Sequence, residues 1–151
     1  MLKIKRITGY DKKAIDEFFS GMDAETKLFF NQTGKSYRRV MSFADGEISD
    51  NVVFAAEYNG SLAGLLVICG CDRSIVWISL CVGEEFRRKR IGTALLRYAD
   101  KFVLKNGGGG ILLSVNKKNI PAILLYEKNG YIRLGEGNGG EYVYVKSYRV
   151  Y

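Results

Sequence analysis

The sequence contains no histidine. That absence excludes Ser-His-Asp and Cys-His catalysis, and it excludes every zinc site that depends on an imidazole ligand. Long apolar runs are missing as well: Ile75–Val82 is far shorter than the roughly 20 residues that span a bilayer. The first residues, MLKIKRITGYDKK, lack the apolar stretch of a signal peptide. We therefore expect a cytoplasmic protein that does not associate with a membrane.

Cysteine is sparse, with three residues: Cys69, Cys71 and Cys81. An odd number in a chain without an export signal indicates reduced thiols. A hairpin of residues 62–71 and 75–82 would pair Cys81 near Leu65, roughly 13 Å along the ladder from Cys69. That separation argues against a three-cysteine metal site. We therefore expect no metal, and we interpret the thiols as small buried apolar groups.

The residues that are present fit one globular domain. The chain has 151 residues, of which 47% are hydrophobic and 26% charged, a composition typical of folded proteins. A chain of this length buries roughly two-thirds of its unfolded surface without disulfides or metals. No linker-like stretch and no repeat interrupts it, so residues 1–151 are predicted to form a single domain.

Positive charge is concentrated in one part of the chain. The formal net charge is +7, and the window Arg87–Lys118 holds nine basic residues against the single acid Asp100, a local charge of +8. The rest of the chain therefore sums to −1. Such a localised field indicates a polyanionic ligand, either a phosphorylated cofactor or a nucleic acid. The alternative is a solvated helix face that serves solubility.

Apolar periodicity predicts the order βααβββαβαββ, an α/β fold with a mixed sheet. Strands are expected at Leu2–Ile7, Val52–Tyr58, Ser61–Cys71, Ile75–Val82, Ile111–Val115, Tyr131–Gly135 and Glu141–Arg149. Helices are expected at Asp11–Phe19, once or twice within Asp23–Gly46, around Ile91–Val103 and at Pro121–Lys128. Asn59-Gly60 supplies the positive φ of a tight hairpin. The nearly continuous apolar run Ile75–Val82 predicts a strand that is covered on both faces.

The segment from Leu80 to Phe102 passes from a buried strand through a short basic loop directly into an amphipathic helix. The unpaired N–H groups of such a helix start face the space beyond the strand end, where the helix dipole adds positive charge. Gly92 would let the backbone approach a ligand closely, and Thr93 adds a hydroxyl group. Four consecutive basic residues surround the same point: Arg87, Arg88, Lys89 and Arg90. We therefore predict a binding site for a pyrophosphate group.

A second glycine-rich segment, residues 135–140, satisfies the pattern G-x-G-x-x-G. It opens a strand rather than a helix, so the dinucleotide-binding mechanism of that motif cannot operate here. We interpret these residues as a hairpin loop.

Two motifs of this chain resemble those of the GCN5-related N-acetyltransferase (GNAT) family. The phosphate loop of that family, Gln/Arg-x-x-Gly-x-Gly/Ala, is similar to Arg87-Arg88-Lys89-Arg90-Ile91-Gly92, and Thr93-Ala94-Leu95-Leu96 continues into the helix as in the family. The second motif, Asn-x-x-Ala-x-x-Leu-Tyr-x-x-x-Gly-Phe/Tyr, is matched by Asn119, Ala122, Leu125, Tyr126, Gly130 and Tyr131. The resemblance implies a single-domain GNAT-like fold, with a mixed, mostly antiparallel sheet and flanking helices.

The resemblance also implies a role for each matching residue. The edge of the strand at Leu80, Cys81 and Val82 would pair with the pantetheine amides of acetyl-coenzyme A. The basic loop and helix start would bind its phosphates through Arg87, Arg88, Lys89, Arg90, Ile91, Gly92 and Thr93. Asn119 would bond the pantetheine arm or the thioester region, and Tyr126 would protonate the leaving thiolate. The alternatives are that Asn119 is only a helix cap and that Tyr126 only packs on Tyr131.

Three positions depart from the family pattern. Arg90 stands where the family usually has its first glycine, and if that position needs positive φ the arginine costs on the order of 1 kcal/mol. Gly83 stands where proline is common. Ser114 stands where related N-terminal acetyltransferases place a glutamate base, so the base is unassigned: a water chain, Glu57 or Glu141.

The predicted function is therefore that of an acetyl-CoA-dependent N-acetyltransferase, in which a neutral primary amine attacks the thioester carbonyl directly. The resemblance implies that Val82 polarises that carbonyl through its backbone N–H. The acceptor, a small molecule or a peptide, would lie between residues 21–47 and the 135–141 loop. Phe29, Phe30 and Tyr37 suggest an aromatic wall there, with core packing as the alternative. The acceptor's identity and a homodimer are left open.

Two other functions remain as alternatives. A nucleic-acid-binding module would use aromatic and basic side chains on one face of the last strand: Tyr142, Tyr144, Lys146 and Tyr148. An ordinary sheet face beneath a helix would show the same pattern, and it is the favoured interpretation, so nucleic acid is a disfavoured partner. The second alternative is a family member that binds the coenzyme without catalysis, as Arg90 and the missing base would allow.

Overall fold

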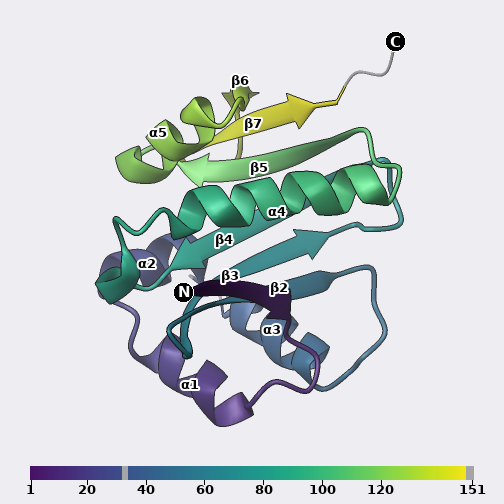
Figure 1. Ribbon diagram of the computed structural model, residues 1–151. Coiled ribbons are helices and arrows are strands. Elements are labelled where there is room, and N and C mark those ends of the chain that lie inside the picture. Colours follow the sequence, from purple (N-terminus) through teal and green to yellow (C-terminus); the bar gives the residue numbers. More distant parts are fainter. Residues whose placement is uncertain (32–33, 149–151) are drawn as a thin grey trace.

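Within residues 1–31 and 34–148, which the computed structural model describes, seven strands form a sheet in the order β1-β2-β3-β4-β5-β7-β6 (Figure 1). The strands are β1 (Leu2–Arg6), β2 (Val52–Tyr58), β3 (Ser61–Cys69), β4 (Ile75–Val82), β5 (Gly110–Asn116), β6 (Ile132–Glu136) and β7 (Glu141–Ser147). The helices are α1 (Lys12–Ser20), α2 (Ala24–Phe30), α3 (Lys35–Ala44), α4 (Ile91–Lys105), α5 (Ile120–Lys128) and the 3₁₀ helix η1 (Glu84–Phe86). β4 and β5 are parallel, and the other neighbouring strands in this sheet are antiparallel.

The predicted α/β fold with a mixed, mostly antiparallel sheet is confirmed. The region between Asp23 and Gly46, where one or two helices were expected, holds both α2 and α3, whereas the predicted element order counted one helix there. β3 ends earlier than expected, because the amide of Cys71 donates to the Asp50 carbonyl oxygen at 2.8 Å instead of continuing the ladder. The predicted end of the last strand, Arg149, lies outside the described residues.

Local sequence features explain where several elements begin and turn. The carboxylate of Asp11 caps α1 by accepting a hydrogen bond from the Lys13 amide at 2.9 Å. Asn59 and Gly60 adopt φ values of 50° and 84° in the tight turn between β2 and β3. Left-handed backbone of this kind suits Asn-Gly, so the predicted hairpin turn is present.

Helices cover both faces of the sheet. On one face, α4 lies across the sheet, and Leu95 of α4 belongs to a buried cluster with Leu66 of β3 (Figure 1). On the other face, Ile15 of α1 and Val40 of α3 pack with Leu65 of β3 in a second buried cluster. The alternating side chains of β3 therefore enter two different cores, as the period-two geometry of a strand requires.

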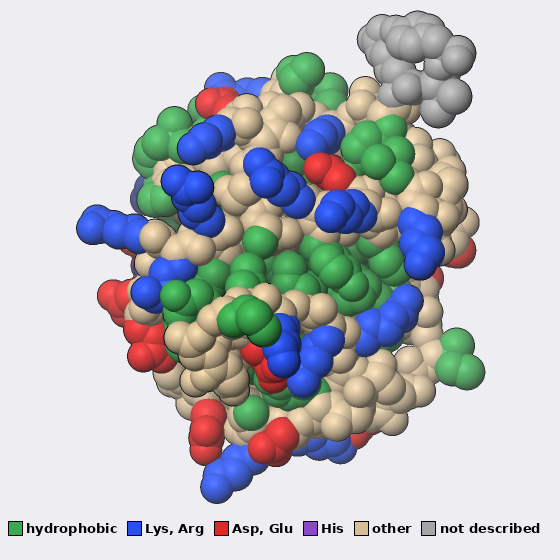
Figure 2. Space-filling view, in the orientation of Figure 1, with side chains coloured by type: hydrophobic (Ala, Val, Ile, Leu, Met, Phe, Trp, Pro, Cys, Tyr) green, Lys and Arg blue, Asp and Glu red, His purple; other side chains and the backbone are tan. Residues whose placement is uncertain are grey.

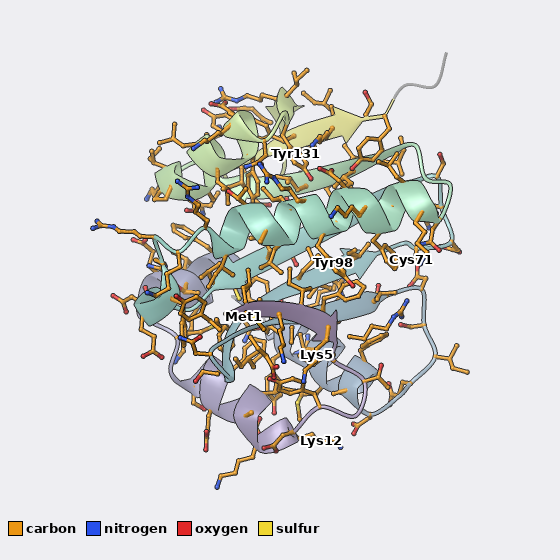
Figure 3. The ribbon with its side chains drawn as sticks, in the orientation of Figure 1. Met1, Lys5, Lys12, Cys71, Tyr98 and Tyr131 are labelled. Atoms are coloured by element: carbon orange, nitrogen blue, oxygen red, sulfur yellow. The ribbon has the colours of Figure 1, made fainter. Side chains whose placement is uncertain are left out.

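Aromatic rings reinforce the layer beneath α4. Tyr98 of α4 points toward the sheet (Figure 3), and its ring lies 4.8 Å from that of Phe54 on β2 in an edge-to-face arrangement. Phe102, one helical turn further along, lies 5.4 Å from the same ring. These contacts hold α4 in place, so its first turn has a defined position relative to the strands.

The open face of the sheet lies at the start of β4. Ile75 is 45% exposed and Trp77 is 42% exposed, so the prediction that this strand is covered on both faces was wrong. The helices on that side, α1 and α3, pack against β2 and β3 rather than over this end of β4. Only the second half of the strand, from Ile78 onward, is largely covered.

The central feature of the sheet is a gap between β4 and β5. The two strands pair only over Ile75–Trp77 and Gly110–Leu112. Beyond that point β4 stays paired with β3 as far as Val82, and β5 stays paired with β7 as far as Asn116. The two strands therefore separate toward their C-terminal ends, and each has one edge without a strand partner there.

None of the helices in the described part of the chain has the length and hydropathy required to cross a membrane.

Candidate active site

A cavity of about 610 Å³ occupies the gap between the separated strands. Its walls come from the second half of β4, the basic loop and first turn of α4, the end of β5, and the helices α2 and α5. A volume of this size is within the range of sites that bind cofactors or drug-sized ligands. The strand, the loop and the helix start that the sequence singled out are therefore brought together at one cavity.

The first turn of α4 forms the polar wall of this cavity. No side chain caps the helix, and the first amide that bonds within it belongs to Ala94, which donates to the Arg90 carbonyl at 3.1 Å. The amides of Ile91, Gly92 and Thr93 donate no hydrogen bond within the described part of the chain, and all three residues line the cavity. Three free N–H groups at the positive end of a helix dipole are suited to an anionic group of a ligand.

The basic loop that leads into α4 has an unusual backbone. Arg88 and Arg90 both adopt the left-handed conformation, with φ values of 65° and 61°. The positive φ that the sequence analysis considered for Arg90 is thus present. Because a Cβ at positive φ crowds the backbone, each of these residues costs about 1 kcal/mol relative to an ordinary conformation. Both arginines are exposed and line the cavity.

The other two basic residues of the loop have different surroundings. Arg87 donates to the Thr26 hydroxyl at 2.6 Å and lies 3.5 Å from the Asp23 carboxylate, so it joins the loop to the start of α2. The Thr26 hydroxyl, followed by Arg87, holds the pKa of Asp23 below its usual value. The ammonium of Lys89 lies 5.1 Å from the Tyr58 ring. Lys89 does not line the cavity. Arg87 lines the cavity, and its guanidinium is held by Thr26 and Asp23.

The free edge of β4 forms a second wall. Leu80, Cys81 and Val82 all line the cavity. The amide of Gly83 donates to the Ala63 carbonyl of the neighbouring chain segment at 2.7 Å. Because peptide groups alternate in direction along a strand, those of Leu80 and Val82 face the opposite way, toward the gap. The strand therefore presents backbone donors and acceptors to an extended ligand.

Tyr126 of α5 packs on Tyr131 and also borders the cavity. Its ring lies 5.8 Å from that of Tyr131, which is labelled in Figure 3. Tyr126 is only 7% exposed, yet it lines the cavity, and its hydroxyl donates no hydrogen bond within the described residues. Burial, and to a smaller degree the nearby Cys81, raises the pKa of this phenol. The hydroxyl therefore remains protonated well above neutral pH.

Asn119 and Gly92 complete the cavity on the side of α5. The Asn119 side chain accepts from the Ala122 amide at 3.4 Å, so the helix-capping role is present, and the residue also lines the cavity. A Cβ on Gly92 would lie 2.8 Å from Cδ2 of Leu125. Gly92 therefore permits the close approach of α5 to the first turn of α4, a role that its position in the sequence did not reveal.

A second cavity, of about 440 Å³, lies on the other side of the gap. It shares Ser79 of β4 and Ser114 of β5 with the first cavity. These two serines lie just beyond the last paired residues of the strands, Trp77 and Leu112. The two cavities therefore meet in the gap, at the point where the strands begin to separate.

Several residues proposed for the acceptor region lie elsewhere. Phe29 and Phe30 line the first cavity, whereas Tyr37 packs its ring 5.2 Å from Phe19 and donates from its hydroxyl to Asp16. The 135–141 loop lines neither cavity; it closes the predicted hairpin, in which the Gly137 amide donates to the Glu141 carbonyl.

The two carboxylates considered as bases also lie outside both cavities. Glu57 accepts a hydrogen bond from Tyr10 and pairs with Lys5 at 3.2 Å (Lys5 is labelled in Figure 3). Glu141 pairs with Asn116 in the ladder between β5 and β7. Direct proton transfer to either carboxylate is thus not supported by its position.

The aromatic face of the last strand is occupied by contacts within the protein. Tyr144 is completely buried, and its hydroxyl donates to Glu127 at 2.7 Å. Lys146 pairs with Asp100 at 2.8 Å, and the Tyr148 hydroxyl donates to the same carboxylate. Figure 2 shows lysine and arginine side chains over the face that carries α4. The tyrosines beneath that helix are not free to stack on bases.

Comparison with known proteins identifies the family of this chain. The model of the Acetyltransferase (GNAT) family matches residues 19–131. The chain therefore belongs to the GNAT family, whose members transfer acetyl groups to small-molecule or peptide acceptors. No curated protein matches the sequence.

Solved structures share the fold at low sequence identity. A GNAT-family acetyltransferase from Streptococcus pneumoniae is 21% identical, covers 98% of this chain and 100% of its own, and has a TM-score of 0.78. The GNAT domain of PAT from S. lividans is 16% identical with a TM-score of 0.83, over 97% of this chain and 90% of its own. The PaiA N-acetyltransferase from Thermoplasma acidophilum, solved in complex with coenzyme A, is 18% identical with a TM-score of 0.79, over 98% and 99%. At these identities the likeness shows the fold alone.

Proposed function

We propose that the protein is an acetyl-CoA-dependent N-acetyltransferase that acts on a primary amine, with the cytoplasm as its predicted location. The observation that supports this most strongly is the cavity between β4 and β5, bordered by the free amides of Ile91, Gly92 and Thr93. The pyrophosphate of acetyl-CoA would bind these amides, with Arg88 and Arg90 adding positive charge.

The pantetheine arm would extend from that point along β4. The N–H of Val82 and the carbonyl groups of Val82 and Leu80 would pair with its amides, as a neighbouring strand would, and the Leu80 N–H would stay free. Asn119 would bond the arm from the side of α5. Arg87 would act indirectly, because its pairing with Asp23 and Thr26 holds the basic loop against α2. The thioester would then lie in the gap between the strands.

In the transfer step, the amine nitrogen forms a bond to the acetyl carbonyl carbon, and the bond from that carbon to sulfur breaks. Because the arm passes Val82 before Leu80, the Leu80 N–H rather than that of Val82 would lie nearest the thioester and stabilise the negative charge on the carbonyl oxygen. The thiolate would take a proton from the Tyr126 hydroxyl, and the proton lost by the amine would pass through water and restore the phenol. The buried phenol is suited to this role because it stays protonated while the attacking amine is neutral.

The binding part of this proposal is tested by thermal unfolding with acetyl-CoA. A ligand present at about 100 times its dissociation constant adds roughly 2.7 kcal/mol to stability. In a domain of this size that corresponds to a rise in Tm of about 5–10 °C. The absence of a rise at millimolar acetyl-CoA, with a rise caused by nucleic acid instead, would refute the proposal.

The catalytic part is tested by the substitution Tyr126→Phe, which keeps the ring and deletes the acid. We expect kcat to fall by about 10²-fold, the lower end of the range for general acids, because a thiolate leaves readily. The affinity for coenzyme A should change little. Tyr98→Phe is the matched control, because Tyr98 of α4 packs on Phe54 and does not line the cavity. Near-normal kcat in Tyr126→Phe, with chemistry rate-limiting, would remove Tyr126 from the mechanism.

A further inference from the structure

The second cavity has a polar character that the acetyl-transfer chemistry by itself does not require. Its inner end is formed by Ser79 and Ser114, where it meets the first cavity. Its outer part is lined by two cations and one anion: Arg39, Arg73 and Asp50. A site that received only a simple alkylamine would have no use for two arginines, since they repel a cationic substrate.

The three charged residues come from different elements and meet at one level of the sheet. Arg39 lies on α3, and Arg73 lies in the turn between β3 and β4. Asp50 precedes β2, and its carbonyl accepts from the Cys71 amide. Burial raises the pKa of the Cys69 thiol, and the charges of Arg39 and Asp50 also act on it, so both lie near the end of β3.

These charges are available to a ligand. Within residues 1–31 and 34–148, Arg39, Asp50 and Arg73 form no ion pair with one another or with other side chains. Lys35 also acts on the Cys69 thiol and adds to the positive charge nearby. An arginine fork matches a carboxylate, and an aspartate matches an ammonium group. Together they match the two charges of an α-amino-acid head group.

The distance along β4 sets the length of the acceptor. Trp77 pairs with Cys69 at the level of the charged residues, and Ser79 lies two residues further into the gap. Two strand residues span about 6.6 Å. Five single bonds of about 1.5 Å in an extended chain, from the α-carbon of lysine to its terminal nitrogen, span about 6 Å. The half-exposed Trp77, on the same face as Ser79, offers a flat apolar wall for the methylene groups between.

Resting on the proposed function, we infer that the acceptor is a free diamino acid of about the length of lysine. Its α-carboxylate binds Arg39 and Arg73, and its α-ammonium binds Asp50. Its terminal nitrogen lies between Ser79 and Ser114 and receives the acetyl group. The new bond joins that nitrogen to the acetyl carbon as the thioester bond breaks, with the protons moving as described above.

Three amines of similar length test this inference: lysine, cadaverine, which lacks the carboxylate, and 6-aminohexanoate, which lacks the α-ammonium. Release of free thiol from acetyl-CoA is measured for each, with a correction for the three protein thiols. Loss of a hydrogen bond to a charged group costs a factor of about 10–100. We therefore expect kcat/KM for lysine to exceed that for each analogue by about 10- to 100-fold. Mass spectrometry should locate the acetyl group on the terminal nitrogen.

Substitutions test whether the preference for lysine depends on the three charged residues. Arg39→Gln and Arg73→Gln should lower kcat/KM for lysine and leave that for cadaverine unchanged or higher. Asp50→Asn should lower it for lysine and spare 6-aminohexanoate. The matched control is Lys13→Gln, at an exposed position of α1 outside both cavities. The comparison of amines on the unaltered protein keeps the test decisive if a variant fails to fold.

The outcomes separate this inference from the proposed function. If acetyl-CoA raises Tm and thiol is released, but cadaverine or Nα-acetyl-lysine amide reacts as well as lysine, the diamino-acid site is wrong and the acetyltransferase stands. Acetylation at the α-nitrogen would also overturn the inference. If acetyl-CoA gives no rise in Tm and no amine releases thiol, both proposals fail.

Discussion

Two substitutions of Arg90, whose backbone is left-handed, should differ in stability and should weaken ligand binding equally. A Cβ at a φ of 61° costs about 1–2 kcal/mol. Arg90→Ala removes the charge and keeps the Cβ, whereas Arg90→Gly removes both. Glycine loses more freedom on folding, which offsets about 0.5–1 kcal/mol. We therefore expect Arg90→Gly to be more stable than Arg90→Ala by about 0.5–1 kcal/mol, which raises Tm by about 1–4 °C.

Lys89 provides the internal control, because the same pair of substitutions is made one residue earlier. Lys89 is not among the described residues with positive φ. At such a position alanine is favoured over glycine by about 0.4–1 kcal/mol, chiefly through the unfolded chain. Lys89→Gly should therefore be less stable than Lys89→Ala. The difference in stability between the glycine and the alanine variant should therefore have opposite signs at these two neighbouring residues of the loop.

Urea unfolding followed by circular dichroism measures the four stabilities, and the midpoint shifts are compared at constant m-value. Titration calorimetry with coenzyme A measures the second effect. Both Arg90 variants lose the same positive charge at the cavity, so they should lose coenzyme affinity to the same extent. A difference of the same sign at Arg90 and Lys89 would refute the strain argument. Unchanged affinity in both Arg90 variants would remove Arg90 from the proposed phosphate site.

Three further results are expected. Arg88→Ala combined with Arg90→Ala should weaken binding of coenzyme A more than binding of acetyl-pantetheine, which lacks the nucleotide phosphates, and wild-type affinity for coenzyme A should fall with salt; equal losses for both ligands would mean that the substitutions act through folding. Gly64→Ala should lower stability by about 1–3 kcal/mol in urea unfolding, because its Cβ would lie 2.8 Å from the Cys81 carbonyl oxygen. Since the pKa of Tyr126 is raised, kcat/KM should rise as the amine loses its proton and should show no fall near pH 10, the pKa of a free phenol; a fall there would contradict the burial of the acid.

Local chemistry made much of this fold predictable. The Asp11 cap and the Asn59-Gly60 turn depend on residues next to one another, so their outcome was visible in the sequence. The same holds for the start of α4, where a buried strand, a basic loop and a helix follow in direct succession. The register that pairs Leu65 with Cys81 also follows from a short hairpin.

Features that depend on distant partners were not predictable. Arg87 was expected at the phosphates, but Thr26, 61 residues earlier, accepts its hydrogen bond. Exposure of Trp77 depends on where α1 and α3 end on the sheet, and a run of apolar residues gives no information about that. The second cavity brings together Arg39 of α3 with Asp50 and Arg73 from two connections, and no spacing in the sequence joins them.

The short contact between β4 and β5 has a mechanical consequence. Three residue pairs, Ile75–Trp77 against Gly110–Leu112, are the ladder that joins the two halves of the sheet. The two halves of the sheet are therefore joined at one end of β4 and β5. A small rotation about this short ladder changes the distance between the two strands most at their C-terminal ends. A ligand that bonds to both strands would hold that distance constant. Amide hydrogen exchange along the unpaired edge of β4 should then report occupancy of the gap more sensitively than exchange in β2 or β3.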